Sequence, residues 1–218
     1  MRKSVVVLTS IILIFASSAC KKEVTLSFTG DIMLDLGNSD QDVLKYVSAS
    51  DGSSVSVSGI NFDLVGEQKA TFKTGEVSET KSVKIKADKL AGLYEISVYQ
   101  LYGNEEIELT SGQGWFITLA KGNQYNQIHI PDSIDNGLRI FKNPGKLVVN
   151  FNGKDSAYIP SYTGAFLFTL EKDAVYSFSN ITYGAIANNQ YAITEFLLKE
   201  SASGYDHYFR VELEKREN

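Results

Sequence analysis

Few residues of this sequence are of a type that supports catalysis. It contains one cysteine, Cys20, and two histidines, His129 and His207. The best-placed carboxylate is Asp31, which follows an alternating stretch at the point where a strand would end. Metal-dependent hydrolysis needs several histidine or carboxylate ligands held together, and neither histidine lies in a motif that would add to Asp31. We therefore predict no catalytic residue, no metal site and no cofactor, and expect that the protein is not an enzyme.

A second group of carboxylates has the spacing of a calcium loop. Asn38, Asp40 and Asp42 stand at its first, third and fifth positions. The loop also requires a glycine at its sixth position and a glutamate at its twelfth, where this sequence has valine and alanine. Ser39 followed by Asp42 and an apolar stripe is instead typical of a helix N-terminus. We predict a short helix that begins after Ser39.

Aromatic residues are the better candidates for a binding surface. Trp115 has the flat apolar ring that stacks on sugars, but it shares a strand face with aliphatic residues, so we expect it in the core. We assign Tyr99, Tyr102 and Tyr208 to the exposed phase of their strands. These three tyrosines are our candidate binding surface for a protein or glycan ligand.

The elements that would position these residues begin after an N-terminal segment of different character. Arg2 and Lys3 precede an apolar run from Val5 to Phe15, and small residues separate that run from Cys20. The run is shorter than the roughly 20 apolar residues that span a bilayer as a helix. We predict that residues 1–19 are a signal peptide, which is cleaved on export.

Residues 17–20 resemble the lipobox of bacterial lipoproteins. In that family the cysteine is acylated, palmitate being one of the chains, and becomes the mature N-terminus. The resemblance implies a lipid anchor at Cys20, a tether over residues 20–23 and a location in the bacterial cell envelope, at the outer membrane. Ser17 departs from the aliphatic residue that most lipoboxes carry three positions before the cysteine. Plain secretion is therefore the alternative.

Composition limits the partners and the source of stability. Removal of residues 1–19 leaves 199 of the 218 residues, enough for one large domain or two small ones. Because Arg2 and Lys3 leave with the signal peptide, the formal charge changes from −5 to −7. An acidic chain lacks the basic footprint of nucleic-acid binding, so we expect no nucleic-acid partner. With Cys20 used for anchoring no disulfide can form, and stability must come from burial.

From Val24 onward the dominant pattern is alternation of apolar and polar residues, with glycine-containing turns between the stretches. This pattern predicts an all-β protein with one or two antiparallel Greek-key β-sandwich domains. The polar segment 131–137 is either the boundary between a sandwich at 24–130 and one at 131–218, or a long loop in one larger domain. The expected strands lie at residues 24–28, 55–57, 60–64, 83–87, 94–98, 147–151, 166–170, 176–178, 191–193 and 205–213.

Two stretches of the chain are alike. Residues 83–98 and 176–194 each run from an alternating strand through a glycine turn to a strand that opens with Tyr94 or Tyr191. They resemble hairpins of carboxypeptidase-regulatory-like, prealbumin-type and immunoglobulin-like bacterial sandwiches. Such domains are mostly non-catalytic spacers, stalk units or binding modules, which is what the resemblance implies here. We expect Tyr94 and Tyr191 to point into the two cores.

Two further resemblances supply alternatives. Residues 28–35 are similar to the opening of metallophosphatase-like lipoproteins of capsule biosynthesis, which implies a metal-dependent hydrolase acting on envelope polymer through Asp31. Lipoprotein pilins built of two prealbumin-type sandwiches also resemble this arrangement, which implies a fimbrial or assembly subunit. Our leading interpretation is a non-enzymatic cell-envelope lipoprotein that presents a β-sandwich surface to a protein or glycan partner.

Overall fold

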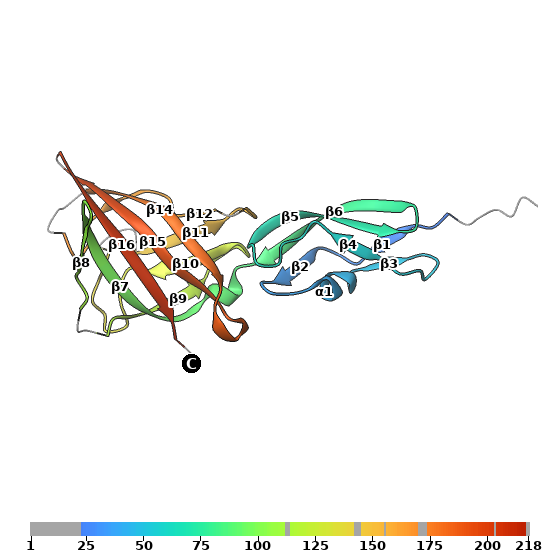
Figure 1. Ribbon diagram of the computed structural model, residues 1–218, viewed down its shortest axis with the longest axis horizontal. Helices are drawn as coiled ribbons and strands as arrows, with labels where there is room; N and C mark the ends of the chain where they lie inside the picture. Colours follow the sequence, from blue (N-terminus) through green and yellow to red (C-terminus); the bar gives the residue numbers. More distant parts are fainter. Residues whose placement is uncertain are drawn as a thin grey trace, which may run out of the picture.

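The computed structural model describes residues 23–216, except 112–113, 142–144, 155, 170–173 and 203. The expected signal peptide and Cys20 lie outside the described residues. The described chain is almost entirely β-structure, mostly in antiparallel pairs, which confirms the all-β class (Figure 1). No helix among the described residues has the length and apolar character to cross a membrane.

The first part of the described chain forms a small sandwich of two sheets. Its smaller sheet pairs β1 (Leu26–Phe28) with β3 (Val47–Ala49). Its larger sheet has the order β2 (Ile32–Asp35), β6 (Val77–Lys86), β5 (Gly66–Thr74) and β4 (Ser56–Ser58), with β2 parallel to β6. Phe28 and Phe72 meet edge to face across the two sheets, with ring centroids 5.0 Å apart. This contact joins the two layers of the sandwich.

Helix α1 (Asp40–Leu44) begins where the sequence predicted. The Asp42 carboxylate accepts hydrogen bonds from the backbone N–H and the hydroxyl of Ser39, both at 3.0 Å, and pairs with Lys45 at 2.7 Å. These contacts lower the pKa of Asp42, with Lys45 as the largest cause. Asp42 therefore caps a helix, as the absence of the calcium-loop glycine and glutamate indicated.

The rest of the chain forms one sheet of ten described strands. Along it the order is β12, β11, β10, β9, β7, β16, β15, β14 and β13, and β8 also pairs with β7. Neighbouring strands mostly follow one another in the chain, as in an up-and-down meander, which differs from the Greek-key connections expected. The sheet curls, so that β12 contacts β14. The bounds are β7 (Gly92–Tyr102), β8 (Glu105–Glu108), β9 (Phe116–Lys121), β10 (Gln127–Pro131), β11 (Lys146–Phe151), β12 (Ala157–Tyr158), β13 (Tyr162–Gly164), β14 (Ala174–Ala185), β15 (Tyr191–Ala202) and β16 (Tyr205–Lys215).

The change from one sheet to the next lies at the 3-10 turn η1 (Asp88–Leu90), between β6 and β7. The boundary expected at residue 131 falls inside the larger sheet, because β10 and β11 on either side of it are paired. Residues 132–137 therefore lie in a loop between β10 and β11 of one continuous sheet.

Two expected strands are loops over their described residues. Residues 60–64 form a loop with a turn, and within 166–169 Phe166 contributes one isolated bridge, to Phe141. Their apolar side chains are nevertheless buried or half-buried, since Phe166 is 1% exposed and Ile60 and Phe62 pack against the core. In these two stretches the alternation of apolar and polar residues reflects burial of one side of the chain, although the backbone does not pair with a neighbouring strand over the described residues.

The predicted core residues are buried. Trp115 is 8% exposed, Tyr94 0% and Tyr191 5%. Both tyrosines belong to the larger sheet, and the N–H of Ile193 donates to the Tyr94 hydroxyl at 3.4 Å. The two similar stretches each contain a 3-10 turn before the tyrosine, η1 and η2 (Ala187–Asn189), but β14 pairs with β15 whereas β6 and β7 lie in different sheets. Tyr94 and Tyr191 therefore anchor one core where two had been expected.

The two units meet through polar contacts and a close backbone approach. Lys89 Nζ donates to the carbonyl of Leu36 at 2.6 Å, and the Tyr191 hydroxyl binds the Asp63 carboxylate. Gly153 N–H donates to the carbonyl of Val65 at 2.9 Å. A Cβ on Gly66, where φ is +126°, would lie 2.1 Å from the nitrogen of Gly153. Only glycine permits this approach, and it sets the units end to end (Figure 1).

Candidate functional site

The residues considered for metal chemistry do not come together. Asp31 precedes β2 in the small sandwich and pairs with Lys84 at 3.4 Å, whereas His129 lies on β10 of the larger sheet. His129 Nδ1 is 3.3 Å from Lys146 Nζ, and burial, followed by the lysine charge, lowers the pKa of this imidazole. Within the described ranges no three histidine, cysteine or acidic side chains are grouped so as to hold a metal ion.

The candidate tyrosines lie on or beside what we call the outer face, the solvent-facing side of β14, β15, β16 and β7. Phe209, Val211 and Leu213 of β16 point into the core, so the residues between them point outward. Tyr208 lies opposite Leu101 on β7, and Arg210 lies opposite Tyr99. Tyr99 and Tyr208 therefore share the outer face.

Tyr102 does not belong to the outer face. It is three residues from Tyr99 on the same strand, so their side chains point to opposite sides of the sheet. Tyr102 is still 50% exposed, because β7 continues past the core into a hairpin with β8. The prediction that all three tyrosines share one phase was wrong for Tyr102. Residues 99 and 102 lie on the same strand, and an odd spacing sends their side chains to opposite faces of the sheet.

Cations cover the two tyrosines that share the outer face. The guanidinium of Arg210 lies 4.4 Å from the ring centroid of Tyr99, and Lys199 Nζ lies 5.7 Å from that of Tyr208. Such contacts are favourable because the ring face is negative. They occupy ring area on which a sugar would stack, so these tyrosines are better suited to contacts through their edges and hydroxyls.

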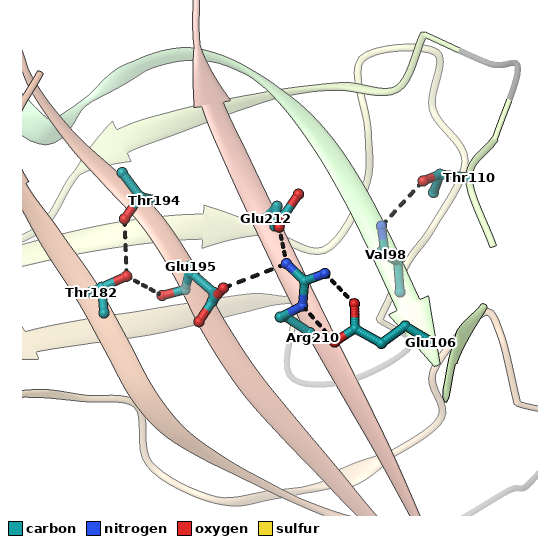
Figure 2. A network of polar contacts seen from close by, with 8 residues as sticks. All are labelled: Val98, Glu106, Thr110, Thr182, Thr194, Glu195, Arg210 and Glu212. Carbon is teal, nitrogen blue, oxygen red and sulfur yellow. Dashed lines mark hydrogen bonds and ion pairs between the residues drawn. The ribbon is translucent and has the colours of Figure 1, made fainter. Parts of the chain in front are cut away.

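Arg210 is the centre of a network that the sequence analysis missed. Figure 2 shows its guanidinium between Glu106 of β8, Glu195 of β15 and Glu212 of its own strand. The distance to the Glu195 carboxylate is 3.6 Å. The hydrogen bond to Glu106 is the main cause of a raised pKa for Arg210. The one arginine among the acidic residues of β16 was a signal in the sequence for an ion-pair network. Its partners could not be identified from it, because they lie on three different strands.

A groove of about 670 Å³ opens on the outer face beside this network. Thr182 and Thr194 line it, and Figure 2 shows the contact between their hydroxyls, which are 2.9 Å apart. Lys215 also lines the groove, and its Nζ donates to the carbonyls of Lys89 at 2.6 Å and Tyr191 at 2.9 Å. Burial lowers the pKa of this amine. The remaining polar lining consists of Ser97, Glu95, Glu195, Glu212 and Glu214.

The glutamates of the groove are paired with arginines. Arg216 contacts Glu95 and Glu214, as Arg210 contacts Glu195 and Glu212. Hydrogen bonding to Glu95 is the first cause of the raised pKa of Arg216. The groove therefore offers donors and acceptors for a polar ligand with little unbalanced charge.

A separate polar cluster lies in the core of the larger unit. Glu200 is 0% exposed, and its Oε1 accepts hydrogen bonds from Thr169 at 2.5 Å and Tyr176 at 2.7 Å. Among the described residues, Glu200 Oε2 and the Tyr162 hydroxyl have no hydrogen-bond partner. Burial, with Tyr176 and Glu200 nearby, raises the pKa of Tyr162. This cluster faces away from the groove and bears on stability.

No protein-family model, no curated protein and no solved structure matches this chain.

Proposed function

We propose that the protein is a non-enzymatic, lipid-anchored lipoprotein of the cell envelope, whose larger sheet presents its outer face to a protein or glycan partner. The observation that supports this most is the groove of about 670 Å³ on that face, with polar groups from four neighbouring strands. Its mixture of hydroxyls and paired charges matches the polar character of non-obligate binding surfaces.

The arrangement of the two units also supports a presenting role. The described chain begins at one end of the molecule, in the small sandwich, and the larger sheet lies at the other end (Figure 1). Anchoring at Cys20 would thus leave the small sandwich nearest the membrane as a spacer. The junction contacts, including Lys89 with Leu36 and Gly153 with Val65, would hold the outer face at a fixed distance.

A photo-crosslinking amino acid at Thr194, in the groove, tests the proposal in cells that naturally make the protein. We expect one or a few discrete adducts, each with a protein or a glycan. The matched control places the same amino acid at Thr80, an exposed residue of β6 in the small sandwich. Adducts that are absent from both positions, or identical at both, would reject the outer face as a binding surface.

A further inference from the structure

The hairpin of β7 and β8 protrudes beyond the core at the end of the larger unit. All four residues of β8 are exposed, and the hairpin has two large exposed hydrophobics, Tyr102 of β7 at 50% and Ile107 of β8 at 51%. The neighbouring hairpin of β15 and β16 adds Tyr205 at 71% and Tyr208 at 46%. Figure 1 shows both hairpins at the end of the molecule opposite to the start of the described chain.

One edge of β8 is open for backbone pairing. Leu109 N–H donates to the Val98 carbonyl at 2.8 Å, next to the bond from Val98 N–H to Thr110 that Figure 2 shows. Hydrogen-bonded positions alternate in an antiparallel pair, so residues 105, 107 and 109 direct their backbone groups to β7. Glu106 and Glu108 direct theirs outward, and no strand of the described chain pairs with that edge.

The charges of β8 indicate whether a second copy of this chain or a basic strand of another protein would pair with this edge. The carboxylate of Glu106 is held by Arg210, while Glu105 and Glu108 form no ion pair within the described part of the chain. A second copy of the chain on this edge would set glutamates close to glutamates, which is unfavourable across strands. A strand carrying lysine or arginine would instead face the unpaired carboxylates.

We propose that β8 is a docking strand for an extended, basic segment of a partner protein, which adds to the larger sheet as a further strand. Main-chain hydrogen bonds to Glu106 and Glu108 give such a complex its affinity, and alternate side chains give it specificity. On one side the added strand lies beside Ile107 and Tyr102, and on the other it continues the outer face. This inference rests on the proposed binding function and names its partner class.

The test uses the full chain in detergent and an end-capped peptide of eight residues in which lysine and valine alternate. A control peptide keeps the lysines but has proline for the two central valines, so its charge is equal while strand pairing is blocked. Titration calorimetry should detect the alternating peptide and show much weaker binding, or none, for the proline peptide. Equal binding of the two peptides would leave only non-specific charge attraction and overturn the proposal.

Two protein variants separate backbone pairing from charge. Glu108→Ala removes a carboxylate but keeps the outward N–H, and we expect roughly a two- to fivefold loss of peptide affinity. Glu108→Pro also removes that N–H. Because this N–H makes no bond to β7, the native hairpin keeps its pairing, while the affinity for the peptide should fall about fivefold further than in Glu108→Ala. Equal affinities of the two variants would reject strand addition, with melting curves to verify folding. If Thr194 adducts persist in that case, the proposed function stands and only the β8 assignment fails.

Discussion

Tyr94 provides the strictest test of the core of the larger sheet. Its side chain is 0% exposed, its hydroxyl donates to the Leu90 carbonyl at 2.7 Å and accepts from the Ile193 N–H at 3.4 Å, and burial raises its pKa above the usual range. It thereby joins the start of β7, the turn η1 and the start of β15. Loss of this one ring should loosen all three elements.

The expected cost can be divided between the ring and its hydroxyl. Tyr94→Phe keeps the ring but leaves a buried carbonyl and a buried N–H without their partner, at about 1–3 kcal/mol. Tyr94→Ala also leaves a cavity, and truncation of a buried aromatic ring costs about 3–5 kcal/mol. At about 2–4 °C per kcal/mol for a chain of this size, the Tm of Tyr94→Ala should fall by roughly 6–20 °C.

Thermal and urea unfolding, followed by tyrosine fluorescence and circular dichroism, measure these changes. Tyr208→Ala is the matched control, because Tyr208 is 46% exposed on the outer face and its loss should alter stability by no more than about 0.5 kcal/mol. The reasoning fails if Tyr94→Ala melts like the wild type, or if Tyr208→Ala is the more destabilised of the two. Either result would mean that the buried and exposed faces of β7 and β16 are exchanged relative to this structure.

The other predictions concern the anchor, the junction and the buried acid. Cys20→Ser should release the protein from the membrane fraction, and retention of this variant after signal cleavage would reject the lipid anchor. Burial, with the Asp63 contact, raises the pKa of Tyr191 to about 12 from an unfolded value of about 10. The stability linked to this raised pKa, from burial first and the Asp63 contact second, is therefore complete below about pH 10 and lost as the pH rises through 12, and Tyr191→Phe should flatten this part of the curve of unfolding free energy against pH. Glu200→Ala should cost about 1–3 kcal/mol by stranding the hydroxyls of Thr169 and Tyr176. Glu200→Gln, which keeps an acceptor, should unfold at nearly the wild-type urea concentration.

Strands with one buried face and a regular period were predictable from the sequence. In β16, for instance, Phe209, Val211 and Leu213 alternate with charged residues, and burial follows this alternation residue by residue. Strand β5 was missed because only Ala70 and Phe72 among its apolar residues mark the buried face. The opposite error occurred at residues 60–64, where a loop half-buries every second side chain and so has the alternation of a strand.

The sequence did not predict which residues of different strands become neighbours, because this depends on the register of strand pairing. The polar segment 131–137 has the composition of a linker, but its first residue ends β10, and the pairing of β10 with β11 makes the rest a loop within one sheet. The partners of Arg210 are likewise 104 residues away at Glu106 and 15 away at Glu195, which no local pattern connects. What the sequence did contain was the phase of Tyr99 and Tyr208, and both are on one face.

The register also explains how an acidic chain holds so many glutamates on one sheet face. Glu195 lies directly opposite Glu212, and Glu95 lies opposite Glu214. Each of these like-charged pairs would weaken the sheet alone, but Arg210 contacts both members of the first pair and Arg216 both members of the second. The outer face is therefore internally balanced, whereas Glu105 and Glu108 on β8 have no such arginine within the described chain. Attraction for a basic partner is thus concentrated at the open edge of the sheet, where backbone groups are also free to pair.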